Sequence, residues 1–489
     1  MRRKLKLDFI TQVIFALIKP VAFMLVIKMA GVILNPYNLG LFLFCRRLSS
    51  TGGALFQLGS TQTLMRYFSM DQSDSNKKTL YILSSLFFFL TLTIGSFSLL
   101  YIFKSPIEKI LFSGIEYSEG FPPWILGLLL AYVLNCMLMA ILISERKLIT
   151  LNIIQMLVGS GFVLLYFFLY AGEISVLGII KYETVAIFLL SVTLFISLLY
   201  NEKIKFSFYN KKDWFEVIRT YFNYGLSRGM VSALDMLLFL IGSWLVKDDM
   251  AQVGNLLISM ASFKLIQVVM LPIGQLSGVV LTQSSGDKSS LRKGITLLVG
   301  GCIVLIVPIL SVVVPWMNEL LSMWVGESSS VKVASFLMII IWATLPYALY
   351  QGLYVTIDML WKSPKNLYSL TMAISIHLIV FLALSQFVNP QLSVAIAFLV
   401  AVFFLGAKVL LDVSQYLTEF PSIGLMRFIS LVGSLFYINN TLADVGGMGA
   451  FALSAVISFV GLLMYVFIAP PPFVNFARNL LVAKKRGVT

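Results

Sequence analysis

Apolar segments about twenty residues long recur along the whole chain, and they limit its fold more than any other feature. A helix needs about 20 mostly apolar residues to cross the hydrocarbon core of a bilayer. The segments cover residues 9–33, 39–65, 79–103, 121–143, 151–171, 177–200, 219–246, 251–281, 293–316, 332–358, 367–387, 391–413, 425–441 and 448–469. Of the 489 residues, 59% are hydrophobic and 12% are charged, whereas about a quarter of a soluble domain is charged. The sequence therefore predicts an all-α polytopic membrane protein with about 14 transmembrane helices. The segment 425–441 is the weakest, because Asn439 and Asn440 interrupt it.

The basic residues between these segments predict how the helices are oriented. Cytoplasmic loops of membrane proteins carry an excess of Lys and Arg. If the N-terminus is cytoplasmic, only four basic residues fall on the outer side, namely Lys104, Lys109, Lys247 and Lys332. Both termini are therefore expected in the cytoplasm, and the segment 104–120 is expected outside. The same bias accounts for the net charge of +14, so nucleic-acid binding is not expected.

A repeated turn indicates how the helices are grouped. Leu39-Gly40 opens the second span after a tight outer turn, and Val253-Gly254 opens the eighth span in the same way. The long cytoplasmic loop 201–218 separates six helices from the next eight. We expect one lobe over residues 1–210, a second over 211–420, and helices 13 and 14 with a cytoplasmic tail over 421–489. Transporters are often built from two such repeats, with the substrate path between them.

Motifs for enzymatic chemistry are absent from the sequence. It has no P-loop and no Cys/His cluster with metal-ligand spacing, and His377 is its one histidine. The outer loops are too short for a catalytic domain. We expect a transporter with no cofactor and no bound metal.

Charged residues inside the spans are the candidate functional residues, because each costs about 2.5–3.5 kcal/mol at a helix centre. The deep set is Lys19, Arg46, Arg47, Arg228, Asp235, Lys264 and His377. Its basic residues outnumber its one acid, which favours an anion-binding cavity, and arginine forks fit phosphates. Arg46 and Arg47 point about 100° apart, so one of them, preferably Arg46, should face this cavity.

Several of these residues have a second interpretation. Asp235 is either a coupling residue or the partner of Arg228 or Lys264 in a structural ion pair. His377 is either a packed polar residue or part of a proton path. Glu183, Lys28, Lys181 and Lys408 are nearer the helix ends and are expected at the membrane interface.

A stripe of polar and aromatic residues follows one face of the tenth span. Tyr347, Gln351 and Tyr354 are spaced to share this face, and their side chains suit sugar rings. Tyrosines near helix ends also form ordinary interface belts.

Two segments resemble the Wzx-type polysaccharide flippases of the multidrug/oligosaccharidyl-lipid/polysaccharide exporter superfamily. Residues 34–42 and 59–69 resemble the N-terminal signature, and the stretch from Asp235 to Gly254 resembles the equivalent segment of the second lobe. The sequence departs from the family at Met236, where a basic or aromatic residue is common, and after Gly254, where the usual Gly-x-Tyr is Gly-Asn-Leu. The resemblance implies two six-helix bundles in a V plus two extra helices. It also implies a cationic cavity and transport of undecaprenyl-pyrophosphate-linked oligosaccharides.

The leading hypothesis is therefore an inner-membrane flippase for a lipid-linked repeat unit of O-antigen (lipopolysaccharide) or capsule. We expect the pyrophosphate at Arg46, Arg228, Lys264, Lys19 and Arg47, and the sugars at Tyr347, Gln351 and Tyr354. A proton or sodium gradient, membrane lipid and a polysaccharide polymerase are the expected partners. One alternative is a multidrug or cation antiporter of the same superfamily, which needs an acidic site in the first lobe. Another is a membrane polysaccharide polymerase, which the short outer loops disfavour.

Overall fold

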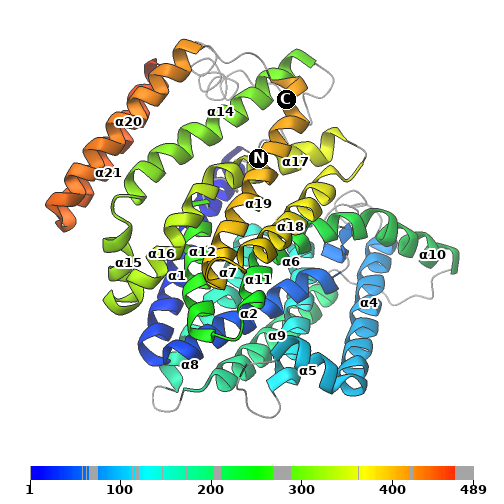
Figure 1. Ribbon diagram of the computed structural model, residues 1–489. Coiled ribbons are helices and arrows are strands. Elements are labelled where there is room, and N and C mark those ends of the chain that lie inside the picture. The colour runs from blue at the N-terminus through cyan, green and yellow to red at the C-terminus, as the bar shows by residue number, and fades with distance from the viewer. Residues whose placement is uncertain are drawn as a thin grey trace. The chain divides into compact units, whose positions relative to one another are not determined.

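The protein is helical throughout the part of the chain that the computed structural model describes (Figure 1). The described residues are 2–57, 59–61, 63–64, 75–112, 115, 121–145, 147–170, 174–201, 211–267, 288–361, 363–417 and 422–468. These residues contain no β-strand, and nine of their helices are long and apolar enough to cross a membrane.

Each predicted span is matched over its described residues by a helix or by a helical run with one irregular turn. Residue 65 of the second span and residues 268–281 of the eighth lie outside the described residues. Six helices match spans singly in the first half, namely α1 (Arg2–Ile33), α2 (Pro36–Phe56), α4 (Ser75–Ile102), α6 (Phe121–Ser144), α9 (Val176–Asn201) and α12 (Met250–Gln267). Five follow in the second half, namely α14 (Lys288–Val313), α18 (Lys365–Leu384), α19 (Pro390–Val413), α20 (Ser422–Val445) and α21 (Gly447–Ile468). The predicted fold class, an all-α protein with about 14 membrane-crossing helices, is confirmed.

The remaining three spans are helical runs with an irregular turn inside. α7 (Leu148–Met156) continues through the π-helical turn η1 (Leu157–Gly161) into α8 (Phe162–Leu169). α10 (Lys211–Thr220) likewise continues through η2 (Tyr221–Leu226) into α11 (Ser227–Leu245). α16 (Glu327–Ile340) continues through a 3-10 turn (Ile341–Ala343) into α17 (Thr344–Leu360). Single π turns inside α-helices are rare and are frequently found at functional sites.

The helices pack into two compact units. Unit 1 comprises Met1–Ile258 and Leu370–Val394, and unit 2 comprises Ser259–Ser369 and Ala395–Thr489. The predicted lobe borders at residues 210 and 420 stay a prediction.

Two short helices occupy the longest predicted outer loops. α5 (Lys104–Phe112) and α15 (Met317–Val325) are each nine residues long. α5 follows the third predicted span of the first lobe, and α15 follows the third predicted span of the second lobe. Each buries apolar side chains, such as Phe112 of α5 and Trp324 of α15. A matching element at matching places is what two repeats of one helical unit would produce.

The repeated turn seen in the sequence also repeats in its hydrogen bonding. Oδ1 of Asn35, the residue just before α2, accepts a hydrogen bond from the backbone N–H of Asn38 at 2.8 Å. Asp249 accepts a bond from the N–H of Gln252 at 3.1 Å at the start of α12. Both are side-chain caps that satisfy a free N–H in the first turn of a helix.

The glycines of the two turns lie against each other within unit 1. A Cβ atom on Gly40 would lie 1.7 Å from the carbonyl oxygen of Met250, and one on Gly254 would lie 3.0 Å from Cα of Gly40. A second such contact lies beyond the other end of α2, where a Cβ on Gly59 would lie 1.8 Å from the carbonyl oxygen of Gly225. Gly59 also has a φ of +76°, which favours glycine. Backbone therefore meets backbone beside both ends of α2.

In unit 2, a polar network fixes the hairpin of α20 and α21, the orange and red pair of Figure 1. Asn439 of α20 is fully buried, and its Nδ2 donates to the Ser458 hydroxyl at 2.9 Å and to the Ser311 carbonyl at 3.1 Å. Its Oδ1 accepts from the Ser454 hydroxyl at 2.5 Å. Trp316 Nε1 in turn donates to Ser454 at 3.1 Å. Asn439 therefore does not interrupt the thirteenth span, because its amide bonds to neighbouring helices.

Candidate functional site

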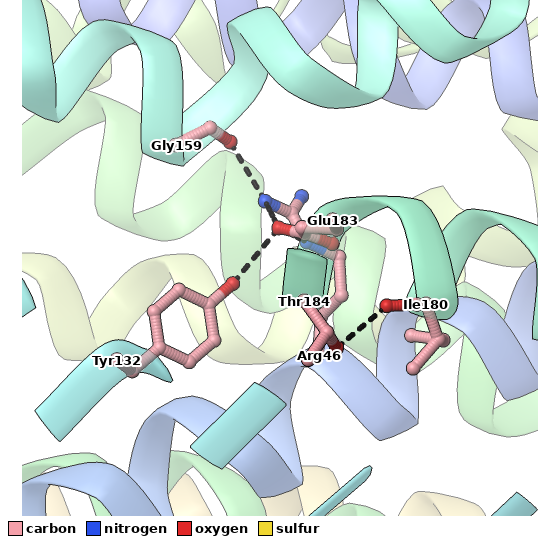
Figure 2. Close-up of polar contacts among 6 residues, drawn as sticks. All are labelled: Arg46, Tyr132, Gly159, Ile180, Glu183 and Thr184. Atoms are coloured by element: carbon pink, nitrogen blue, oxygen red, sulfur yellow. Dashed lines mark hydrogen bonds and ion pairs between the residues drawn. The ribbon is translucent and has the colours of Figure 1, made fainter. Parts of the chain in front are cut away.

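Arg46 of α2 and Glu183 of α9 form an ion pair inside unit 1 (Figure 2). The Nη2 and Nε atoms of Arg46 donate to Oε1 of Glu183 at 2.8 Å and 3.1 Å. The Arg46 side chain is 10% exposed and that of Glu183 is not exposed at all. Glu183 is buried because α2 and α6 pack on α9, and its expected place at the membrane interface stays a prediction. Such buried charges persist in proteins when they are paired and hydrogen-bonded.

Two further groups complete this network. The Tyr132 hydroxyl of α6 donates to Oε1 of Glu183 at 3.0 Å, and Arg46 Nη2 also donates to the carbonyl of Gly159 at 2.9 Å. Gly159 lies in the π-helical turn η1, and such a turn disturbs the regular i→i−4 ladder. The neighbouring Thr184 stays outside the network, because its hydroxyl donates to the carbonyl of Ile180 on its own helix (Figure 2).

The network is uneven, with three donors on one carboxylate oxygen. Oε2 of Glu183 is buried and has no hydrogen-bond partner among the described residues. Nη1 of Arg46 donates to none of the side chains or carbonyls drawn in Figure 2. Buried polar atoms are normally bonded, so Oε2 is an acceptor that a further donor or a proton would satisfy. Oδ2 of Asp412, the buried acid that pairs with Lys408 and Lys365 in unit 2, is unbonded among the described residues in the same way.

Lys19 of α1 is held by two amides of α7. Its ammonium donates to Oδ1 of Asn152 at 2.7 Å and to Oε1 of Gln155 at 2.5 Å. An ammonium has three donors, so two bonds leave one N–H available, and the side chain is half-buried. Asn152 and Gln155 lie on the same helical run as Gly159, so α7 and η1 position both Lys19 and Arg46.

Arg47 points away from Arg46, as the 100° step of a helix requires. Its Nη2 donates to the carbonyl of Met236 on α11 at 3.4 Å, and its guanidinium lies 5.3 Å from the Phe239 ring centroid. Arg228 and Asp235 are also on α11 and are half-buried. The deep charges of unit 1 thus lie on α1, α2, α9 and α11.

The other predicted residues lie in varied surroundings. His377 of α18 is fully buried, and a Cβ on Gly242 of α11 would lie 3.5 Å from its Nε2. Lys264 of α12 is half-buried. Both roles considered for Asp235 and for His377 stay predictions.

The polar stripe of α17 is partly turned into unit 2. Tyr347 is 2% exposed, its ring packs 5.7 Å from that of Phe263, and its hydroxyl accepts from Gln351 at 2.9 Å. Tyr354 and Gln351 are half-buried. Both are more exposed than Tyr347. The contact of these three residues with sugars stays a prediction.

Sequence reasoning did not include Glu183 among the site residues, and it missed Tyr132, Asn152, Gln155 and Gly159. One signal could have found the first of them. Glu183 is the one acidic residue inside the six predicted spans of the first lobe, whereas three basic residues lie deep in the first two. A buried cation needs a compensating acid, so Glu183 was the available partner.

No protein-family model matches this chain, and no curated protein does. Among solved structures, it is similar to the lipid II flippase MurJ in its inward closed conformation, with a TM-score of 0.70 and 13% identity over 96% of this chain and 100% of that one. It is also similar to an inward-facing multidrug resistance MATE family transporter of the MOP superfamily, with a TM-score of 0.62 and 13% identity over 83% and 98%. The eukaryotic MATE transporter AtDTX14 gives a TM-score of 0.57 and 14% identity over 86% and 96%. At these identities the likeness shows a shared fold, that of multi-span helical transporters.

Proposed function

We propose that this protein is a flippase of the bacterial inner membrane. Its substrate would be an oligosaccharide repeat unit linked to undecaprenyl pyrophosphate, moved from the cytoplasmic to the outer leaflet for O-antigen or capsule assembly. Alternating access in a fold of two repeats would carry the unit across.

The extent of the fold likeness carries this proposal. The lipid II flippase is matched over 96% of this chain and along its own full length. The MATE transporters match over 82–86% of this chain while nearly all of their own length is used. The unmatched share has about the size of the α20–α21 hairpin with the residues after it. A flippase of a lipid-linked substrate is therefore the better template for the whole chain.

The charges of unit 1 support an anionic substrate. Lys19, Arg46, Arg47 and Arg228 are four cations deep in the spans of unit 1, where the deep acids are Glu183 and Asp235. Lys19 keeps a free donor in a half-buried position, where a phosphate oxygen would satisfy it. Lys264 and the sugar contacts of Tyr347, Gln351 and Tyr354 remain part of the proposal on the sequence argument alone.

Glu183 favours a second candidate, a multidrug antiporter. Such a protein needs an acid in its first six helices, and Glu183 is a buried one. Arg46 neutralises that carboxylate in the structure, however, so the site as folded offers no net negative charge to a cationic drug.

Deletion of the gene followed by analysis of lipid-linked sugars separates the hypotheses. Loss of a flippase leaves single repeat units on the cytoplasmic face of the membrane. Loss of a polymerase leaves single units that have crossed, and loss of a drug pump changes neither pool. Normal polymer in the deletion strain would overturn the flippase assignment.

A further inference from the structure

We propose that Glu183 is a proton-binding site that exchanges Arg46 with the substrate. When the pyrophosphate group takes over the Arg46 guanidinium, Glu183 takes up one proton. This inference rests on the proposed function, because it assigns a second role to the same anion site.

The geometry provides a place for the proton. Oε1 of Glu183 already accepts from Arg46 and from Tyr132, whereas Oε2 is buried without a partner among the described residues. A proton on Oε2 converts the carboxylate to a neutral acid and leaves the Tyr132 bond to Oε1 intact. The charge balance is simple: a phosphate oxygen replaces Oε1 as the acceptor of the Arg46 N–H groups, and a proton from water neutralises the carboxylate.

The proton is required because two anions compete for one guanidinium. A buried charge that loses its partner is strongly destabilising, so Glu183 cannot lose Arg46 and stay ionised at low cost. Arg46 can begin the exchange without losing its partner, since its Nη1 is not engaged in the network of Figure 2. Its guanidinium presents N–H groups on three nitrogens, which suits a bridge between two acceptors.

No other described group forms a polar contact with this carboxylate. α9 packs on α2, α6 and α8, which present Arg46, Tyr132 and Tyr166. Tyr166 stacks on Tyr170, with ring centroids 4.7 Å apart. On α9 itself, Lys181 lies over the Trp124 ring at 5.7 Å. Arg46 is therefore the charged group that mainly stabilises the ionised form of Glu183, and losing the contact with Arg46 favours protonation of the acid.

Linkage gives the direction of the effect. If binding of the pyrophosphate group draws a proton onto Glu183, then protonation of Glu183 strengthens that binding by the same factor. The affinity should rise as the pH falls, relative to a protein in which residue 183 cannot titrate.

The test uses the purified full-length protein in lipid nanodiscs, with inorganic pyrophosphate as the probe. Calorimetric titrations in two buffers of different ionisation enthalpy count the protons taken up on binding. We expect the wild type to take up about one proton more than Glu183→Gln, and the variant to bind with a weaker pH dependence. The same probe in both proteins removes the titration of pyrophosphate itself from the comparison.

Asp412→Asn is the matched control. Asp412 is another buried acid, paired with Lys408 at 2.7 Å and Lys365 at 3.3 Å in unit 2, and its removal should leave the proton count unchanged. If Glu183→Gln does not fold, difference infrared spectra of the wild type replace it, and a protonated-carboxyl band should appear when pyrophosphate is added.

The outcomes separate the two proposals. Binding without extra proton uptake by the wild type, or equal uptake by Glu183→Gln, overturns the exchange and leaves the flippase standing. Binding with uptake but without the infrared carboxyl band assigns the proton elsewhere and also overturns it. A wild type that binds no pyrophosphate overturns the anion site itself.

Discussion

Two of the buried polar networks that join helices among the described residues are built on opposite principles. In unit 2, Asn439 joins α20 to α21 and to Ser311 of α14 through neutral groups. In unit 1, Arg46 and Glu183 join α2 to α9 and η1 through full charges. The neutral network leaves none of its side-chain atoms unbonded, whereas the charged one leaves Glu183 Oε2 without a described partner.

The contrast suggests two roles for buried polar groups: a structural role, which is to join helices, and a functional role in transport. Interhelical hydrogen bonds inside membranes average about 0.6 kcal/mol, and a neutral network supplies them with little risk. A buried charge costs about 2.5–3.5 kcal/mol to insert, so it is a poor way to fasten helices. Unit 2 shows that this chain can join helices without charge, although it also joins α18 to α19 through the ion pair of Lys365 and Asp412. Variants of both networks therefore test whether the ion pair of unit 1 does more than join helices.

The largest expected effect is that of Arg46→Gln. It removes the cationic partner of the buried Glu183 carboxylate and leaves Tyr132 as the remaining partner. The cost is up to about 3–5 kcal/mol for an acid that stays ionised, and it is smaller for an acid that takes up a proton. We expect a marked loss of protein from the membrane, measured by immunoblotting, and a lower Tm. The double variant with Glu183→Gln should restore the protein level but not polymer synthesis. Full recovery of polymer in the double variant would make the ion pair a purely structural element, like the network of unit 2.

Backbone contacts should give the next largest effect. In Gly40→Ala the new Cβ meets the Met250 carbonyl at 1.7 Å, and overpacking of this kind costs about 1–3 kcal/mol. We expect a lower Tm and reduced polymer. Gly95→Ala is the control, because nothing lies within 4 Å of a Cβ on Gly95, and it should be silent. Equal behaviour of the two variants would contradict the tight contact.

Asn439→Leu tests the neutral network. It removes hydrogen bonds that are worth up to about 1.7 kcal/mol each inside a membrane, so we expect a drop in Tm of a few degrees. Polymer per molecule of protein should stay normal. Asn440→Leu, at an exposed neighbouring position, should change neither. A loss of transport from well-folded Asn439→Leu would contradict a purely structural role for the neutral network.

The smallest change in stability is expected from Asn152→Ala. Lys19 keeps Gln155 as a partner, so the free energy of unfolding should fall by about 1 kcal/mol. Polymer synthesis should fall more than stability does, because the ammonium loses its fixed position. Ser160→Ala, a small change at another buried residue of the same helical run, provides the comparison. Equal polymer in the two variants would count against Lys19 as a substrate contact.

The sequence predicted the helices well and their partners poorly. A bilayer sets the length and polarity of each span, so the segments could be read directly from the chain. The repeated turns before α2 and α12 were also visible, because their glycines repeat, whereas the caps formed by Asn35 and Asp249 were found in the structure. The depth of Arg46 was predicted, but its partner lies 137 residues away, and periodicity indicates a face of a helix without naming what packs on it.

Irregular turns were beyond the reach of the sequence for a related reason. The π turn that brings the Gly159 carbonyl to Arg46 adds one residue to a helix that is apolar on nearly all sides, so it shifts no visible pattern. The helices α5 and α15 are too short to register as spans.

If the two predicted lobes are repeats, Gly40 and Gly254 are equivalent residues, and they meet as such residues do on the axis of a symmetric dimer, each against its own counterpart. On such an axis any side chain is duplicated and must share its space with a copy of itself. Glycine is the residue for which that duplication adds no volume. A single six-helix ancestor that dimerised would thus already have this close glycine contact between its two copies. Fusing two copies of its gene would preserve the contact without any new substitution. After such a fusion the two halves would be free to differ, and an acid such as Glu183 would arise in one of them without being imposed on the other.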